Sequence, residues 1–242
     1  MKKEEKYIEY LISWIKKQVE KANKKGVIFG LSGGIDSALV GVLGQKAFPD
    51  NHLGVIMPIR DMEADKQDIE KLANKFNIKT IVVDLLPTFT SIKNTLNLNS
   101  RLSIANIQPR LRMTTLYALA QEYNYLVLGT DNLVEMYIGY FTKYGDGGVD
   151  LLPIVNLTKT QVYKVAKHIG VVDEILTKAP SAGLWENQKD EDEMGFSYKD
   201  FDIFLKNPEK LSAKKRQRIE YLHKISEHKR NKIPQPKLKM ED

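Results

Sequence analysis

The hydrophobic pattern of the chain alternates between two kinds of segment. In one kind, apolar side chains recur at helical spacing, which predicts amphipathic or buried helices. Such helices are expected over residues 6–22, 35–47, 63–76, 85–124, 131–140, 158–170 and 207–232. The other kind is a short run of apolar residues, which is typical of a buried strand. Strands are expected over residues 27–31, 52–58, 79–85, 125–130 and, fifth, 151–155.

Strand and helix alternate along the chain, which predicts a parallel sheet with right-handed crossovers. We therefore expect the α/β class: a doubly wound, mostly parallel five-stranded sheet with helices on both faces. The sequence has no internal repeat and no linker-like stretch, so residues 1–242 are expected to form a single domain. The polar segments 141–150 and 178–197 are expected to be loops. Gly26 is expected to end the first helix, and Asp61 to cap the third.

Composition narrows the class of protein. The chain is 42% hydrophobic and 28% charged, with no apolar run long enough to cross a membrane and no signal-like N-terminus, so a cytoplasmic protein is expected. It has no cysteine, which excludes disulfides, thiolate zinc sites and cysteine nucleophiles. The net charge of +6 indicates mainly a lysine-rich solvated surface, with an anionic partner as the alternative.

The segment GLSGGIDS, Gly30 to Ser37, joins an expected strand to an expected helix. Glycines there let the backbone approach a ligand, and the free N–H groups at a helix start form an anion site. The segment has neither the GK[ST] ending of a Walker loop nor the GxGxxG spacing. A simple glycine turn is the alternative. Asp36 argues against that alternative, because a carboxylate beside phosphates is explained by a metal ion between them, usually magnesium.

This loop resembles the pyrophosphate-binding loop of the N-type ATP pyrophosphatases, which cleave ATP between the α- and β-phosphates and adenylate a substrate oxygen. Five further segments resemble one family in that superfamily, the ammonia-dependent NAD synthetases. They are ANIQPRLRM (105–113), LGTDNLVEMYIGYFTKYGDGGVDLLPI (128–154), LTKTQVYKVAKHIG (157–170), KAPSAGLWENQKDEDEMGFSYKDFD (178–202) and HKR (228–230). The likeness keeps its order over nearly the whole chain. It implies a Rossmann-like fold of the adenine nucleotide alpha hydrolase type.

The resemblance also implies roles for individual residues. Those implied to bind ATP are Gly30, Leu31, Ser32, Gly33, Gly34, Ile35, Asp36, Ser37, Thr130, Lys159 and Ser181. Asp36 and Glu135 are implied to hold Mg2+, and Lys159 to act in catalysis by neutralising charge on pyrophosphate. Those implied to contact deamido-NAD are Arg110, Lys143, Asp150, His228 and Lys229. Arg112, two positions after Arg110 on the expected helix, is expected to point elsewhere.

Each of these roles has a plainer alternative. Glu135 and Lys159 could be surface residues of their helices, and capping is an ordinary task for Ser181. The basic C-terminal segment could simply be solvated. One physical argument supports the site: Thr130 follows the fourth strand, at the same sheet edge as the loop 30–37. The carboxyl edge is where open α/β sheets bind ligands.

The implied reaction consumes ATP, deamido-NAD and ammonia, with Mg2+ as cofactor. The nicotinate carboxylate attacks the α-phosphorus, pyrophosphate leaves, and ammonia then displaces AMP to give NAD. Ammonium must first lose a proton, and Asp146 is the candidate base, with a turn role as its alternative. Glutamine-using relatives carry an amidase domain with a cysteine nucleophile, so no glutaminase domain is expected. Family members are homodimers with the dinucleotide at the subunit interface, and neither a nucleic acid nor a membrane partner is expected.

Two other functions use the same loop. A tRNA-modifying ATP pyrophosphatase such as lysidine synthetase would suit the basic charge, but it leaves the segment FTKYGDGGVD unexplained. A nucleotide sensor without turnover would bind ATP only. Two carboxylates beside the phosphates argue against the sensor, because binding alone does not require them.

Overall fold

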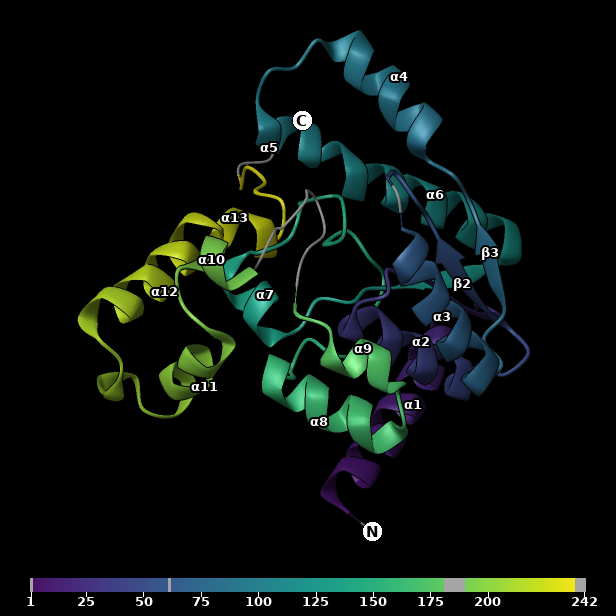
Figure 1. Cartoon of the computed structure of the whole chain (residues 1–242), viewed down its shortest axis with the longest axis horizontal. Helices are drawn as coiled ribbons and strands as arrows, with labels where there is room; N and C mark the ends of the chain where they lie inside the picture. The colour runs from purple at the N-terminus through teal and green to yellow at the C-terminus, as the bar shows by residue number, and fades with distance from the viewer. Residues whose placement is uncertain (1, 61, 181–189, 238–242) are drawn as a thin grey trace.

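The fold is built on a four-stranded parallel sheet (Figure 1). The structure is a computed structural model that describes residues 2–60, 62–180 and 190–237. The strands are β1 (Gly26–Gly30), β2 (His52–Ile56), β3 (Thr80–Val82) and β4 (Tyr125–Leu128), and their order is β3-β2-β1-β4. The chain runs from β1 outward to β3 and then returns to place β4 on the other side of β1. The order therefore reverses between β1 and β4, where open α/β sheets form a ligand crevice.

Helices cover both faces of the sheet. The first half of the chain contributes α1 (Lys3–Lys21), α2 (Ile35–Ala47), α3 (Glu63–Phe76), α4 (Leu86–Leu96), α5 (Arg101–Ala105) and α6 (Ile107–Tyr123). The second half contributes α7 (Leu133–Ile138), α8 (Lys159–Ile169), α9 (Asp173–Thr177), α10 (Asp190–Met194), α11 (Tyr198–Lys206), η1 (Pro208–Lys210), α12 (Ala213–Ile225) and α13 (Glu227–Arg230). The predicted doubly wound α/β class is confirmed.

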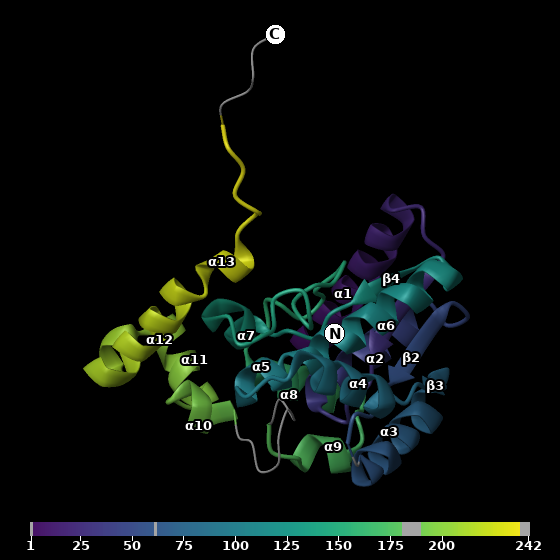
Figure 2. The ribbon, with the colours of Figure 1, turned by 90° about the horizontal axis from the view of Figure 1, so that it is seen from above.

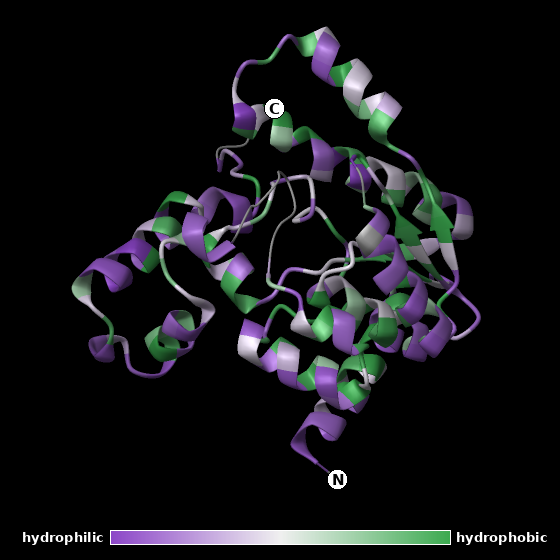
Figure 3. Cartoon of the chain, viewed as in Figure 1, coloured by the Kyte–Doolittle hydropathy of each residue, from purple (hydrophilic) through white to green (hydrophobic). Residues whose placement is uncertain are grey.

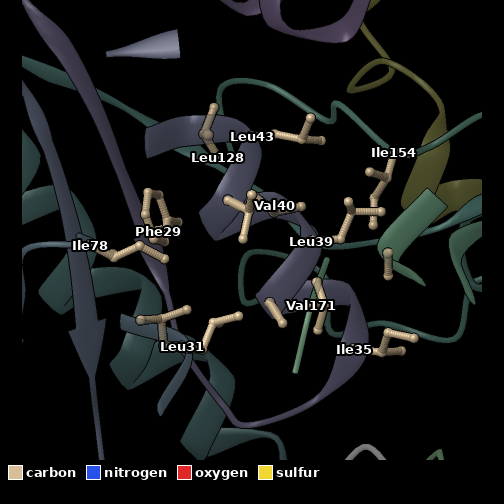
Figure 4. Packing of buried hydrophobic residues seen from close by; sticks show 14 of the residues in the cluster. Phe29, Leu31, Ile35, Leu39, Val40, Leu43, Ile78, Leu128, Ile154 and Val171 are labelled. Atoms are coloured by element: carbon tan, nitrogen blue, oxygen red, sulfur yellow. The ribbon is translucent and has the colours of Figure 1, made fainter. Parts of the chain in front are cut away.

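Two hydrophobic clusters pack against opposite faces of the sheet, as the alternation of strand side chains requires. Phe29 of β1 and Leu128 of β4 belong to the cluster beneath α1, α2, α3 and α8, part of which Figure 4 shows. Their neighbours Ile28 and Val127 face the other way, onto α6. In Figure 3 the strands and the sheet-facing sides of the helices are largely hydrophobic in colour, whereas α12 is mostly hydrophilic. None of the described helices is long and apolar enough to cross a membrane.

The predicted fifth strand at 151–155 is wrong as a strand. The chain pairs with β4 only at Leu151, through a single parallel bridge to Leu128. The Leu151 N–H donates to the Val127 carbonyl, but the chain turns from Pro153 onward. Proline has no N–H to continue a ladder, so the pairing ends after one residue.

The C-terminal region forms a third hydrophobic cluster together with α7. Phe201 of α11 and Ile219 of α12 pack with Val134 and Ile138 of α7. One helix here contradicts the sequence prediction, because α10 lies inside the expected loop 178–197. A second helix, α11, follows it and was not predicted. The basic terminal helix is confirmed, but it divides into η1, α12 and α13. Beyond α13 the described chain extends away from the body, as Figure 2 shows.

Two predicted helix boundaries also need comment. The first helix ends before Gly26, because Asn23 adopts a left-handed conformation with φ of 54° and Gly26 already belongs to β1. Asparagine tolerates that conformation because its short side chain can hydrogen-bond locally. Asp61, the predicted cap of α3, lies outside the described residues.

Candidate active site

The loop 30–37 is held by hydrogen bonds among its own residues. The hydroxyl oxygens of Ser32 and Ser37 lie 3.0 Å apart, and the Ser37 hydroxyl donates to the Gly34 carbonyl at 2.9 Å. The Ser32 N–H donates to the Ser37 hydroxyl. Gly33 has a φ of 79°, a conformation that side chains other than glycine rarely adopt. The loop is therefore shaped before any ligand arrives, and it leads directly into the N-terminus of α2.

Three charged side chains meet where α2, α7 and α8 begin. Lys159 Nζ lies 2.5 Å from Asp36 Oδ2 and 3.5 Å from Glu135 Oε1. Asn132 Nδ2 donates to Asp36 Oδ1 at 3.1 Å, and the Asn132 N–H donates to Glu135 Oε2 at 3.0 Å. Asn132 thus caps α7 and ties both carboxylates together. Each of the three charges is brought in from a different segment of the sequence.

Burial and charge act against each other in this cluster. Lys159 is only 4% exposed, although it is the first residue of α8. Burial lowers the pKa of Lys159, but Asp36 and Glu135 outweigh it and raise the pKa above its usual value. Burial raises the pKa of Glu135 to about 7, while Lys159 acts to lower it. The alternatives that made Lys159 and Glu135 ordinary surface residues are therefore excluded by the structure.

A second loop, residues 139–148, lines the same cavity as the first. It is held in place by residues that lie far away in the sequence. Lys229 of α13 donates through Nζ to the carbonyls of Gly139 and Phe141, both at 2.7 Å. Lys143 Nζ donates to the His228 carbonyl at 2.8 Å. Within the basic C-terminal segment, α13 is therefore packed against this loop, whereas the described residues after it, 231–237, are exposed. Burial lowers the pKa of Lys229, with Asp146 acting in the opposite direction.

Two aspartates lie at this side of the site, of which Asp131 is buried and Asp146 is half-buried. Asp146 Oδ1 accepts the N–H of Thr142 at 2.8 Å. Burial raises the pKa of Asp146, against the lowering effect of that hydrogen bond and of Lys229. Asp131, which follows β4, is 3% exposed. Burial raises the pKa of Asp131 well above its ordinary value, and the largest added like-charge effect comes from Asp146.

These groups line one cavity of about 860 Å³, which lies within the usual size of a ligand site. The sequence-predicted residues on its wall are Gly30, Leu31, Ser32, Gly33, Gly34, Ile35, Asp36, Ser37, Arg110, Thr130, Glu135, Lys143, Asp146, Lys159, His228 and Lys229. Asp150 is not among the described lining residues, since its carboxylate accepts the Tyr117 hydroxyl at 2.9 Å and the Val127 N–H at 2.8 Å. Ser181 lies outside the described residues.

Among the lining or supporting residues that were missed in the sequence are Arg112, Asn132 and Asp131. Arg110 Nε donates to the Lys143 carbonyl, whereas Arg112 Nε donates to the carbonyl of Met57 at the end of β2. The two arginines point in different directions, as predicted. Both nevertheless line the cavity, which extends along the carboxyl edge of the sheet. Burial lowers the pKa of Arg112 to about 10. Asn132 was recognisable from its Asn-x-x-Glu spacing, which is a capping-box pattern. Asp131, beside it, gave no separate signal.

A preformed anion loop, two half-buried carboxylates and a buried lysine between them are typical of a nucleotide-binding site in an α/β protein. Comparison with known families gives the narrower answer. The chain belongs to the NAD synthase family, whose family model matches residues 7–233.

Individual relatives agree with this assignment. The NH3-dependent NAD+ synthetase of Mycoplasmopsis pulmonis is 53% identical, over 96% of this chain and 90% of its own length. Among solved structures, the NMN synthetase of Francisella tularensis is 40% identical with a TM-score of 0.92, covering 98% of this chain and all of that one. The NH3-dependent NAD synthetase of Campylobacter jejuni is 26% identical with a TM-score of 0.83, covering 97% and 99% of the two chains.

Proposed function

We propose that this chain forms NAD by amidating deamido-NAD with ammonia, at the expense of ATP, which is converted to AMP and pyrophosphate. The supporting observation is the cluster of the buried Lys159 with the half-buried Asp36 and Glu135 beside the phosphate loop, in a chain of the NAD synthase family. The test is to mix purified protein with ATP, magnesium, ammonium and deamido-NAD. Equal amounts of pyrophosphate and NAD are expected, and release of neither would contradict the proposal.

In the proposed first step, the chain positions two anions and neutralises charge. The loop amides and Lys159 lie where the departing pyrophosphate would be stabilised. A carboxylate is a poor electrophile, so adenylation is the purpose of the ATP. The 139–148 loop and α13 line the cavity, and their proposed role is to exclude water from the adenylate.

Mg2+ is the proposed metal, and the residues present fit it. Asp36 and Glu135 offer hard oxygen ligands, and magnesium is commonly held by one or two carboxylates together with substrate phosphates. No group of three or more His, Asp or Glu suited to a metal occurs in the described part of the chain, so the phosphates would complete the coordination. The ion would supply positive charge beside the leaving group.

Glu135→Gln keeps the bond to the Asn132 N–H and should raise the magnesium concentration needed for activity. An unchanged dependence of activity on magnesium would contradict this role.

Asp146 is the proposed proton acceptor in the amide-forming step. It lines the cavity, is half-buried, and its carboxylate is held in place by the Thr142 N–H, as a general base requires. The donor is proposed to be free ammonia, because a chain without cysteine has no thiol to attack glutamine. Glutamine alone should therefore give no NAD with pure protein, and measurable product from glutamine would contradict this.

One observation supports a second candidate substrate. It is the TM-score of 0.92 to a protein described as an NMN synthetase. Amidation of the corresponding mononucleotide, nicotinate mononucleotide, is the same reaction without the adenylate half of the dinucleotide. The two candidates are separated by kcat/KM for each substrate with the same enzyme preparation. We favour deamido-NAD because the relative from Mycoplasmopsis pulmonis, at 53% identity, is named an NAD+ synthetase. A higher kcat/KM for the mononucleotide would reverse this order.

We also propose a homodimer that pairs through the face formed by α4, α5 and α6. This face exposes large apolar side chains, among them Leu96 at 54% and Leu102 at 60%. Exposed apolar surface of this kind marks an interaction site. Leu102→Glu should shift the mass measured by light scattering from dimer to monomer, whereas an unchanged mass would place the contact elsewhere. The cytoplasmic location stays a prediction.

A further inference from the structure

Asp131 is a buried carboxylate that the reaction steps above do not use. It follows β4 directly and lines the same cavity as Asp146 and Thr130. Its Oδ2 is buried and has no hydrogen-bond partner among the described residues. Buried polar groups are nearly always hydrogen-bonded, and an unpaired carboxylate is the costliest exception. A fold that only needed a turn after β4 would not place such a group there.

The other charges of the site leave Asp131 uncompensated. Lys159 is engaged by Asp36 and Glu135, and Lys229 by two backbone carbonyls. Arg112 donates to Met57. The charged groups that act most strongly on Asp131 are Asp146, Glu135, Asp36 and Lys229, and among these four only the lysine is positive. This part of the cavity is therefore suited to a small cation.

The chemistry of amide formation asks for two proton acceptors. Ammonium loses one proton to become the nucleophile ammonia. Ammonia attacks the acyl carbon, the C–O bond to the phosphate of AMP breaks, and AMP departs with the electron pair. The nitrogen then loses a second proton to become the neutral amide. One acyl adenylate, one ammonium ion and two carboxylates thus give one amide, one AMP and two carboxylic acids. The charge balances because the phosphate of AMP carries one more negative charge than the phosphate of the acyl adenylate.

We propose that Asp131 and Asp146 together form the ammonium site, with Asp131 contacting the ion through its unpartnered Oδ2. This inference rests on the proposed function and extends it, because it assigns the second acceptor and the binding place of the nitrogen donor. Two carboxylates side by side hold ammonium as a cation and take its protons at the site of reaction. Such a site also explains why an unpaired carboxylate is retained in the unliganded protein.

The test is Asp131→Asn, which keeps the shape and removes the charge. Pyrophosphate release measured without ammonium should stay close to that of the wild type. The KM for ammonium should rise, and NAD formation should fall by about a hundredfold, the size typical of a lost general base. Asp173→Asn is the matched control, because Asp173 is an exposed carboxylate on α9. That variant should leave both steps unchanged.

A second measurement does not depend on turnover. Ammonium chloride should raise the Tm of the wild-type protein more than the same concentration of tetramethylammonium chloride, and Asp131→Asn should lose this difference. Without ammonium, Asp131→Asn should be at least as stable as the wild type, and more so at alkaline pH, because the raised pKa of Asp131 makes its charged form costly. A lower Tm at every pH would make Asp131 a structural residue and overturn the inference.

The kinetic outcomes separate the two proposals. Equal loss of pyrophosphate and NAD in Asp131→Asn, with an unchanged KM for ammonium, would remove Asp131 from the ammonium site but leave the proposed function intact. Absence of both products from the wild-type protein with deamido-NAD would instead contradict the proposed function.

Discussion

The loops 30–37 and 139–148 face the same cavity, but the chain holds them in different ways. The first is fixed by its own serines and by the start of α2, all within eight residues. The second is fixed by Lys229, about ninety positions further along the chain. The phosphate side is thus a local structure, whereas the other side depends on the docking of the C-terminal helices.

This difference indicates a division of tasks. A rigid loop suits ATP phosphates, whose charge must meet preorganised N–H groups. The opposite side must admit a second substrate and later exclude water, which suits a loop whose position depends on a docked segment. Four substitutions test whether the two sides act separately, beginning with the largest expected effect.

Asp36→Ala removes the charge that the phosphate side places at the start of α2. Adenylation should fall by about a thousandfold, at the upper end of what one preorganised group contributes. Pyrophosphate release with saturating deamido-NAD measures this, and Asp173→Ala serves as the exposed control. Near-normal release by Asp36→Ala would show that the phosphate side does not act through this carboxylate.

Asp146→Asn tests the opposite side without changing its shape. Adenylation should persist while amide formation falls by about a hundredfold, as for a missing general base. The defect should shrink as the pH rises, because free ammonia then forms without the enzyme. Separate measurement of pyrophosphate and NAD between neutral and alkaline pH is required. Equal losses in both, without recovery, would give Asp146 a role in holding the dinucleotide instead.

Lys229→Met removes the link between α13 and the 139–148 loop. Two buried carbonyls lose their donor, and the free energy of unfolding should fall by about 1–3 kcal/mol. The KM for the nicotinate substrate should rise, while the KM for ATP stays unchanged if the two sides are independent. Lys232→Met, an exposed lysine three positions later, is the control. A parallel rise in both KM values would show that the sides are coupled.

Ser37→Ala has the smallest expected effect. It removes the hydroxyl that donates to the Gly34 carbonyl and accepts from Ser32, so the free energy of unfolding should fall by about 1 kcal/mol. The KM for ATP should rise and that for the nicotinate substrate should not. Chemical denaturation measures the stability, with the exposed Ser91→Ala on α4 as control. No change in either quantity would mean that the glycines alone shape the loop.

The same contrast explains what the sequence could predict. The loop 30–37 and the four strands were predictable, because glycine positions and apolar runs act over a few residues. The side formed by 139–148 was reached only through a resemblance, because nothing in the local pattern couples Lys229 to Gly139. The missed helices α10 and α11 bury side chains such as Met194 and Phe201 against α7, a partner far away in sequence. The fifth strand is the opposite error, an element that was predicted but does not form. An apolar run alone does not indicate how soon Pro153 ends the pairing.

The close contact between α13 and Gly139 has a consequence for synthesis on the ribosome. A Cβ at Gly139 would lie 2.2 Å from Ser226 Cβ, so the end of α7 meets the start of α13 with no room for a larger residue. All four strands and the loop 30–37 have been synthesised once β4 has emerged, whereas α7, α8 and α13 follow it. The nitrogen-handling side must wait for about a hundred more residues. A chain that stops before α13 lacks the contacts of Lys229 to Gly139 and Phe141, so the 139–148 side of the cavity is complete only after the last helix has been made.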